Sequence, residues 1–205
     1  MTTPTTEAAR FWDGHHAAHL PDGEPHANAR LVEVGSGWPP GRALDLGSGA
    51  GGDALWLARR GWRVTAADIS AVALAHLDHR AGEAGLADLI TTERHDLAAT
   101  FPAGPFDLVA AHYLHTSFPL PREHLLRQAA AALAPGGRLL VVEHGSVAPW
   151  SWSRNPDSCP PLTAPSLDPA RWTVERADTL PRRATGPGGQ TADVVDHLLL
   201  IRRTR

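Results

Sequence analysis

The segment with the clearest potential for chemistry is the glycine-rich stretch at residues 45–52, Asp-Leu-Gly-Ser-Gly-Ala-Gly-Gly. It lies between an apolar run and a helical pattern, which is where parallel sheets bind ligands at the carboxyl ends of their strands. Glycine lets the backbone turn sharply and approach a ligand closely, and the start of the following helix offers free N–H groups. We therefore expect Gly47, Ser48, Gly49 and Gly51 to lie in a ligand-binding loop.

This loop alone is compatible with two kinds of cofactor. Gly47, Gly49 and Gly52 satisfy the pattern G-x-G-x-x-G, which is typical of dinucleotide binding. Asp68 ends the next predicted strand, 21 residues after Gly47. An acidic residue at that point binds ribose hydroxyls in a nicotinamide dinucleotide or in another adenosyl cofactor.

The elements around the loop alternate between short apolar strands and amphipathic helices, which predicts an α/β fold with a parallel sheet covered on both faces. Residues 6–37 predict two short helices, so we assign residues 1–41 to an N-terminal helical cover and residues 42–205 to the core of the same domain. Strands are predicted at 43–46, 62–67, 89–94, 106–111, 139–142, 172–177 and 194–201, and the core helices at 53–60, after Ser70 and from Pro121. Residues 146–168 are rich in proline and serine and interrupt this alternation.

Three further features distinguish between the two cofactors. Asp45 stands two residues before the first glycine and completes D-x-G-x-G-x-G, and Asp96 follows the third predicted strand. Phe-Asp-Leu-Val at 106–109 precedes Leu-Ala-Pro-Gly-Gly at 133–137 and an apolar strand. In this order and spacing, residues 42–143 resemble the class I S-adenosylmethionine-dependent methyltransferases.

The resemblance implies a Rossmann-like, mostly parallel seven-stranded sheet with helices on both faces, and it implies roles for individual residues. The loop would face the methionine part of S-adenosylmethionine, and the product would be S-adenosylhomocysteine. The remaining cofactor contacts would be Asp68 to the ribose, Ile69 and Leu97 beside the adenine, Asp96 to the adenine amine, and Ala111 and His112 beside the methionine moiety.

A narrower resemblance points to the small bacterial methyltransferases related to tellurite-resistance and thiopurine S-methyltransferases. It rests on Trp-Asp at 12–13, Trp-Leu-Ala at 56–58, Tyr-Leu-His at 113–115 and His144. In that group the N-terminal segment folds over the cofactor, so Trp12 would pack on it or anchor the segment to the core. The chain departs from the group at His16, where a tyrosine is usual, and in the near absence of a helix before the sixth strand.

Histidines at the predicted strand ends are candidates for proton transfer, because imidazole titrates near neutral pH. His115 and His144 are expected near the acceptor, with Tyr113 beside them. Each histidine also has a purely structural alternative, as a helix cap or a backbone partner. The spacing of His112 and His115 would permit a metal, but no cysteine or carboxylate cluster accompanies them and we expect none.

Composition limits the remaining classes of function. The net charge is −3 and no basic stripe is present, so neither a nucleic-acid nor a membrane partner is expected. The sequence contains no lysine, which excludes a lysine nucleophile. Cys159 is its only cysteine, so no disulfide can form within the chain, as is typical of cytoplasmic proteins. We expect a monomeric or homodimeric cytoplasmic enzyme.

The expected function is methyl transfer from S-adenosylmethionine to a small molecule, preferably to sulfur or another chalcogen. Oxygen or nitrogen of a specialised metabolite is the alternative acceptor. An NAD-dependent oxidoreductase, a non-catalytic binding module and a nucleic-acid methyltransferase are more distant alternatives.

Overall fold

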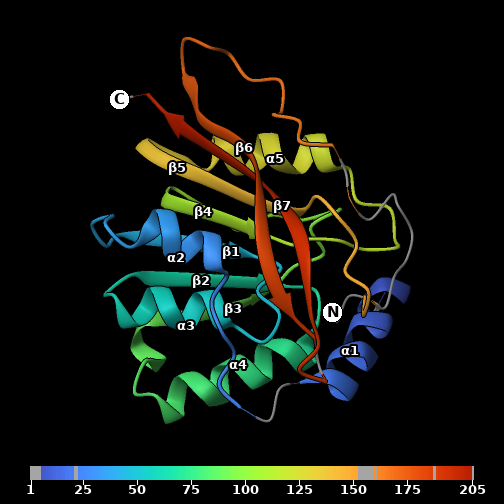
Figure 1. The fold of residues 1–205 in the computed structure, drawn as a ribbon. Helices are drawn as coiled ribbons and strands as arrows, with labels where there is room; N and C mark the ends of the chain where they lie inside the picture. Colours follow the sequence, from blue (N-terminus) through green and yellow to red (C-terminus); the bar gives the residue numbers. More distant parts are fainter. Residues whose placement is uncertain (1–5, 21–22, 152–158, 160, 187, 205) are drawn as a thin grey trace.

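A computed structural model describes residues 6–20, 23–151, 159, 161–186 and 188–204. The described chain forms a central sheet with helices on either side (Figure 1). Its helices are α1 (Glu7–His19), α2 (Ala29–Gly35), α3 (Gly52–Arg59), α4 (Ala71–Glu83), the 3₁₀ turn Ala87–Leu89 and α5 (Arg122–Ala131). Its strands are β1 (Arg42–Leu46), β2 (Arg63–Asp68), β3 (Ile90–Arg94), β4 (Phe106–His112), β5 (Leu133–His144), β6 (Trp172–Thr185) and β7 (Thr191–Arg203).

The seven strands have the order β3-β2-β1-β4-β5-β7-β6. The four pairings among β1 to β5 are parallel, whereas β7 pairs antiparallel with both β5 and β6. The sheet is therefore mixed, which corrects the expectation of a mostly parallel one. The physical reason is that a short turn between residues 186 and 190 joins β6 to β7, and a short turn can connect only antiparallel neighbours.

Local sequence explains where the helices begin and why the central strands are buried. Ser70 caps α4 by accepting a hydrogen bond from the Ala73 N–H, and Thr6 and Asn28 cap α1 and α2 in the same manner. Strands β1 and β4 are buried along almost their whole length, as expected for strands covered on both faces. These caps and apolar runs give the same element order that the sequence predicts.

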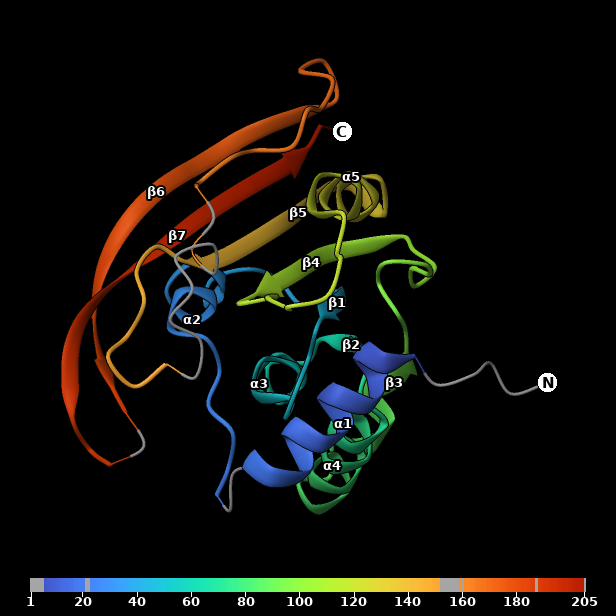
Figure 2. The same cartoon turned by 90° about the vertical axis from the view of Figure 1, so that its right-hand side faces the viewer.

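Two apolar cores lie on opposite faces of the sheet. Helices α2, α3 and α4 cover one face, where Leu31, Leu55 and Leu77 are buried. Helix α5 covers the other face through Leu125 and Leu126 (Figure 2). No helix forms between β5 and β6 in the described part of that connection, as the sequence predicts.

The β6–β7 hairpin is much longer than the two closing strands expected from the sequence. Figure 2 shows it curving out of the plane of the sheet on the side of α2 and α3. Leu180 on this hairpin packs against the core under α2. The hairpin therefore brings residues from the end of the chain close to the carboxyl ends of the central strands.

Among the described residues, no helix has both the length and the apolar character needed to cross a membrane.

Candidate functional site

The glycine loop follows β1 at the edge of the sheet where the parallel strands end. Gly47, Gly49 and Gly51 have φ values of 69°, 50° and 84°, in the left-handed region that favours glycine. A Cβ atom on Gly51 would lie 2.2 Å from Cδ1 of Leu77, so the loop packs closely against α4. The loop is thus held in one conformation by backbone geometry and by close packing.

Asp68 at the end of β2 joins the loop to the next strand. One of its carboxylate oxygens accepts a hydrogen bond from the Gly49 N–H at 2.9 Å, and the other accepts from the Ser70 N–H at 2.8 Å. The side chain is buried but lines a cavity. Asp68 therefore fixes the loop and presents its remaining lone pairs to that cavity.

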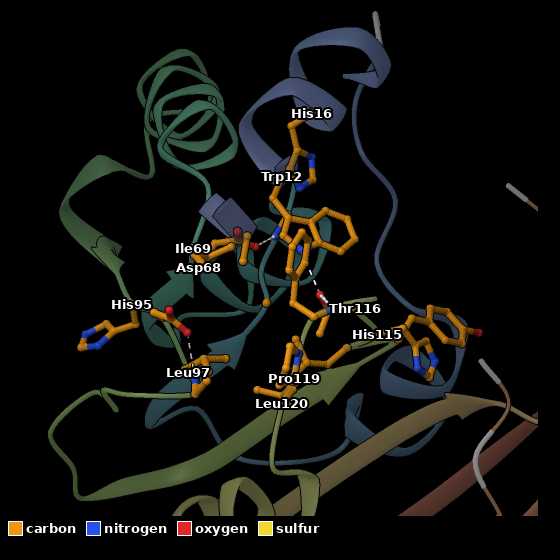
Figure 3. Close-up of a pocket in the computed structure, with 18 residues that line it drawn as sticks. Trp12, His16, Asp68, Ile69, His95, Leu97, His115, Thr116, Pro119 and Leu120 are labelled. Atoms are coloured by element: carbon orange, nitrogen blue, oxygen red, sulfur yellow. Dashed lines mark hydrogen bonds between the residues drawn. The ribbon is translucent and has the colours of Figure 1, made fainter. Parts of the chain in front are cut away.

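This cavity brings together most of the residues singled out from the sequence (Figure 3). Predicted site residues that line it are Trp12, Gly47, Gly49, Asp68, Ile69, Asp96, Leu97, Tyr113 and His115. Predicted site residues outside its lining are Asp45, Ser48, Gly51, Ala111, His112 and His144. The structure thus brings nine of the predicted residues to one cavity at the strand ends, and the other six lie outside its lining.

Three of the polar residues outside the lining have atoms without a hydrogen-bond partner in the described part of the chain. Asp45 Oδ2, Ser48 Oγ and His112 Nε2 are buried without a hydrogen-bond partner among the described residues. Burial raises the pKa of Asp45 well above its usual value, and the charges of Asp53 and Asp68 raise it further. A bound cation or hydrogen-bond donor would give Asp45 Oδ2 its missing partner and would lower the pKa of this carboxyl group.

His112 is oriented by a carboxylate. Its Nδ1 lies 2.7 Å from Oδ2 of Asp53, at the start of α3. Because a carboxylate only accepts, Nδ1 carries a proton in this contact, and in the Nδ1-protonated neutral form of the ring Nε2 is an acceptor. The other oxygen of Asp53 accepts from the Asn28 N–H, which connects this pair to the segment before α2.

Helix α1 closes the cavity from above. Trp12 Nε1 donates to Thr116 Oγ1 at 3.3 Å, a hydrogen bond drawn in Figure 3 that joins α1 to the segment after β4. The next residue, Asp13, accepts hydrogen bonds from the Ser70 hydroxyl and the Val72 N–H at the start of α4. The Trp-Asp pair thus places one side chain at the cavity and docks the helix with the other.

Three rings form a stack at the ends of β4 and β5. The centroids of Tyr113 and His144 lie 4.1 Å apart with nearly parallel planes, and those of His115 and His144 lie 5.3 Å apart. Burial lowers the pKa of His144 to about 4, with smaller effects from neighbouring charges. It is therefore neutral at pH 7, and it stacks behind His115 rather than lining the cavity.

His115 does line the cavity, and its Nε2 is buried without a partner among the described residues. Burial lowers the pKa of His115, and Arg122 lowers it further, while Glu143 acts in the opposite direction. Arg122 and Glu143 form a bidentate ion pair with two 2.7 Å hydrogen bonds. A neutral imidazole at this position can accept a proton.

Three segments add lining residues to which sequence reasoning assigned no role in the site. Helix α1 contributes Ala8 and His16, the segment after β3 contributes His95 and Ala98, and the segment after β4 contributes Leu114, Thr116, Phe118, Pro119 and Leu120. The only available signal was the position of residues 114–120 directly after a central strand. Across the described residues, no group of three or more His, Cys, Asp or Glu side chains could hold a metal ion.

Residues 43–137 match the family described as "Methyltransferase domain". This range contains the glycine loop, Asp68, Asp96 and His115. This range, a little under half of the chain, is a methyltransferase domain, and the sheet has the class I methyltransferase fold.

Two curated relatives share this domain. The "27-O-demethylrifamycin SV methyltransferase" of Amycolatopsis mediterranei is 34% identical over 138 residues, which is 64% of the chain and 48% of the relative. The "Ribosomal RNA small subunit methyltransferase C" of Chromohalobacter salexigens is 36% identical over 123 residues, 55% of the chain and 35% of the relative. The chain thus spans between a third and a half of the length of these relatives.

Solved structures agree with the fold and with the cofactor. A protein described under "Conversion of a Disulfide Bond into a Thioacetal Group during Echinomycin Biosynthesis" has a TM-score of 0.67 and 24% identity, over 96% of this chain and 93% of its own. TehB from Haemophilus influenzae has a TM-score of 0.64 and 19% identity, over 87% and 63%. A methyltransferase from Geobacter sulfurreducens in complex with S-adenosylhomocysteine has a TM-score of 0.51 and 26% identity, over 68% and 58%.

Proposed function

We propose that this protein transfers the methyl group of S-adenosylmethionine to a small, apolar acceptor, with a thiol as the favoured nucleophile. The observation that supports this proposal is a single cavity lined by Gly47, Gly49 and Asp68 on one side and by His115 on another. In this proposal the cofactor and the proton acceptor would share one cavity.

The residues present fit S-adenosylmethionine. The cofactor's ammonium group would supply the missing partners of Asp45 Oδ2 and His112 Nε2, which lie at the ends of adjacent strands β1 and β4. Ser48 Oγ, which lacks a partner among the described residues, would donate to the methionine carboxylate. The loop at Gly47, Gly49 and Gly51 would face the methionine part, with Ala111 against its chain. When bound, S-adenosylmethionine supplies the methyl carbon and the sulfur leaving group.

The adenosine part has a matching set of residues. Asp68 would accept from the ribose hydroxyls with the lone pairs that Gly49 and Ser70 leave free. Ile69 and Leu97 would pack on the adenine, and Asp96 would accept from its amine. Trp12 would cover the cofactor, with residues 1–41 acting as a cover within the same domain as residues 42–205.

The acceptor side of the cavity is apolar. Leu114, Phe118, Pro119 and Leu120 line it, and none of these side chains is charged. Such a wall favours a neutral acceptor over a charged one. His115 would take the proton of the incoming nucleophile, whereas Tyr113 and His144 would support its ring.

A thiol is favoured because its pKa is near 8.5, so transfer of its proton to a neutral imidazole costs less free energy than transfer from a phenol or an alcohol. An oxygen acceptor is the second candidate, because the relative from Amycolatopsis is named for O-methylation and matches 64% of this chain. Both acceptors arrive protonated, so both would depend on His115.

The test is release of S-adenosylhomocysteine from S-adenosylmethionine with a panel of small thiols, phenols and amines. We expect turnover on apolar thiols, and a loss of about a hundredfold in His115→Asn, which is typical of a lost general base. His124→Asn is the matched control, because His124 is an exposed histidine on α5. Turnover on phenols alone would replace sulfur by oxygen as the acceptor, and silence on every acceptor would refute the proposal.

A further inference from the structure

A buried carboxylate on the last strand joins the hairpin to the acceptor side of the site. Asp196 on β7 is fully buried. Its Oδ2 accepts from Arg182 Nε at 2.9 Å and from Arg30 Nε at 3.2 Å, and its Oδ1 accepts from the Tyr113 hydroxyl at 2.9 Å. Three elements, β6, α2 and the end of β4, therefore converge on one side chain.

Tyr113 is restrained from several directions. Arg182 Nη2 also donates to the Tyr113 hydroxyl, at 3.2 Å. Burial and Asp196 raise the pKa of this hydroxyl to about 12, so it stays protonated and donates to the carboxylate. The ring itself also stacks on His144.

The backbone at Tyr113 has an unusual conformation. Among the described residues, Tyr113 is the only one other than glycine with a positive φ, at 50°. Its N–H donates to the Val142 carbonyl and its carbonyl accepts from the His115 N–H, at 2.7 and 2.8 Å. A bulky residue keeps such a backbone only where its surroundings hold it. The turn at Tyr113 directs Leu114 and His115 into the cavity wall.

We infer that Asp196 is a positioning residue for the acceptor side of the site: it fixes Tyr113 and thereby sets the orientation of His115. The inference rests on the proposed role of His115 as proton acceptor. Asp196 lies outside the range matched by the methyltransferase family, residues 43–137.

The alternative is that Asp196 only attaches the hairpin to the sheet. The two readings differ in what Asp196→Asn changes, because Asn keeps the shape and one acceptor but loses the charge that pairs with the arginines. If Asp196 positions the site, the ring of His115 shifts while the cofactor loop, on the other side of the cavity, is unaffected. If it is only an attachment, the loss is general and does not involve His115 specifically.

The first measurement does not need turnover. Nitrogen NMR of the histidine side chains should show shifted His115 and His144 ring signals in Asp196→Asn and smaller shifts in Tyr113→Phe. Tyr113→Phe loses only the hydroxyl, so it keeps the inference testable if Asp196→Asn does not fold. Asp193→Asn is the matched control, since it makes the same change on the same strand at a side chain that is 82% exposed. Unshifted His115 signals in both Asp196→Asn and Tyr113→Phe would overturn the inference.

The second measurement uses an acceptor on which the wild type turns over. Asp196→Asn should lower kcat by about tenfold to a hundredfold, the range that follows a small misplacement of a reacting group. S-adenosylhomocysteine affinity should stay within about twofold, and Asp193→Asn should match the wild type.

The double variant Asp196→Asn/His115→Asn separates the two readings. We expect it to be no slower than His115→Asn alone, because both changes remove the same contribution. Additive losses, or an equal loss of S-adenosylhomocysteine affinity, would overturn the inference. A wild type silent on every acceptor would instead refute the proposed function, and the NMR comparison would still decide the role of Asp196.

Discussion

Asp68 should both anchor the glycine loop through hydrogen bonds and contact the cofactor, and Asp68→Asn tests both roles at once. Each carboxylate oxygen accepts one backbone N–H, from Gly49 at 2.9 Å and from Ser70 at 2.8 Å. Asparagine has one acceptor oxygen, so its NH₂ group would face the other N–H. A buried donor left unpaired costs about 1–3 kcal/mol.

Taking about 2 kcal/mol for this loss, the melting temperature should fall by about 4–8 °C, given about 2–4 °C per kcal/mol for a domain of this size. The affinity for S-adenosylhomocysteine should fall about tenfold, which is about 1.4 kcal/mol, because one acceptor for the ribose is lost. Thermal unfolding measures the first effect and isothermal titration calorimetry the second. Asp78→Asn is the control, since Asp78 accepts only from the exposed Thr92 hydroxyl among the hydrogen bonds of its side chain in the described structure.

The two effects can be refuted separately. An unchanged melting temperature would show that the two backbone hydrogen bonds do not hold the loop. A lower melting temperature with unchanged S-adenosylhomocysteine affinity would support the role of Asp68 in anchoring the loop and refute its contact with the ribose. A comparable loss of affinity in Asp78→Asn would attribute the effect to net charge rather than to the position of Asp68.

Three further perturbations test other parts of the site. Gly52→Ala should destabilise the fold by about 1–3 kcal/mol in urea unfolding, because its Cβ would lie 2.3 Å from the rigid carbonyl oxygen of His26; a wild-type midpoint would refute this close packing. Trp12→Ala should weaken S-adenosylhomocysteine binding more than Thr116→Val, which loses only one hydrogen bond, and equal affinities for both variants and wild type would refute α1 as a cover. The pKa of His144 is lowered to about 4, so between about pH 6.5 and pH 4 the unfolded chain binds a proton there that the folded chain does not. The free energy of unfolding should therefore fall as the pH drops through this range, and His144→Asn should flatten the fall. An unchanged slope in His144→Asn would refute the contribution of His144.

Much of the fold was predictable because it depends on local patterns. Strand patterns of four to six residues located the first five strands, although β5 begins at Leu133 and not at the predicted residue 139, and Ser70 located the start of α4. The extent of β6 and β7 was underestimated, because their outer halves are partly exposed and carry few apolar residues. The antiparallel direction of β7 relative to β6 follows from the short connection closed by the hydrogen bond between the Gly186 N–H and the Gln190 carbonyl, because a short connection joins antiparallel neighbours.

The sequence by itself determined the glycine loop, the acidic residues at the strand ends and the order of elements that brings them to one edge. Those features depend on backbone geometry and on spacing, which are local properties. Only the tertiary structure decided which side chains line the cavity: His115 does, whereas His144 stacks on it outside the lining. It also paired Tyr113 with Asp196, 83 residues away, because such a contact depends on how the hairpin curves over the sheet, and no local pattern encodes that.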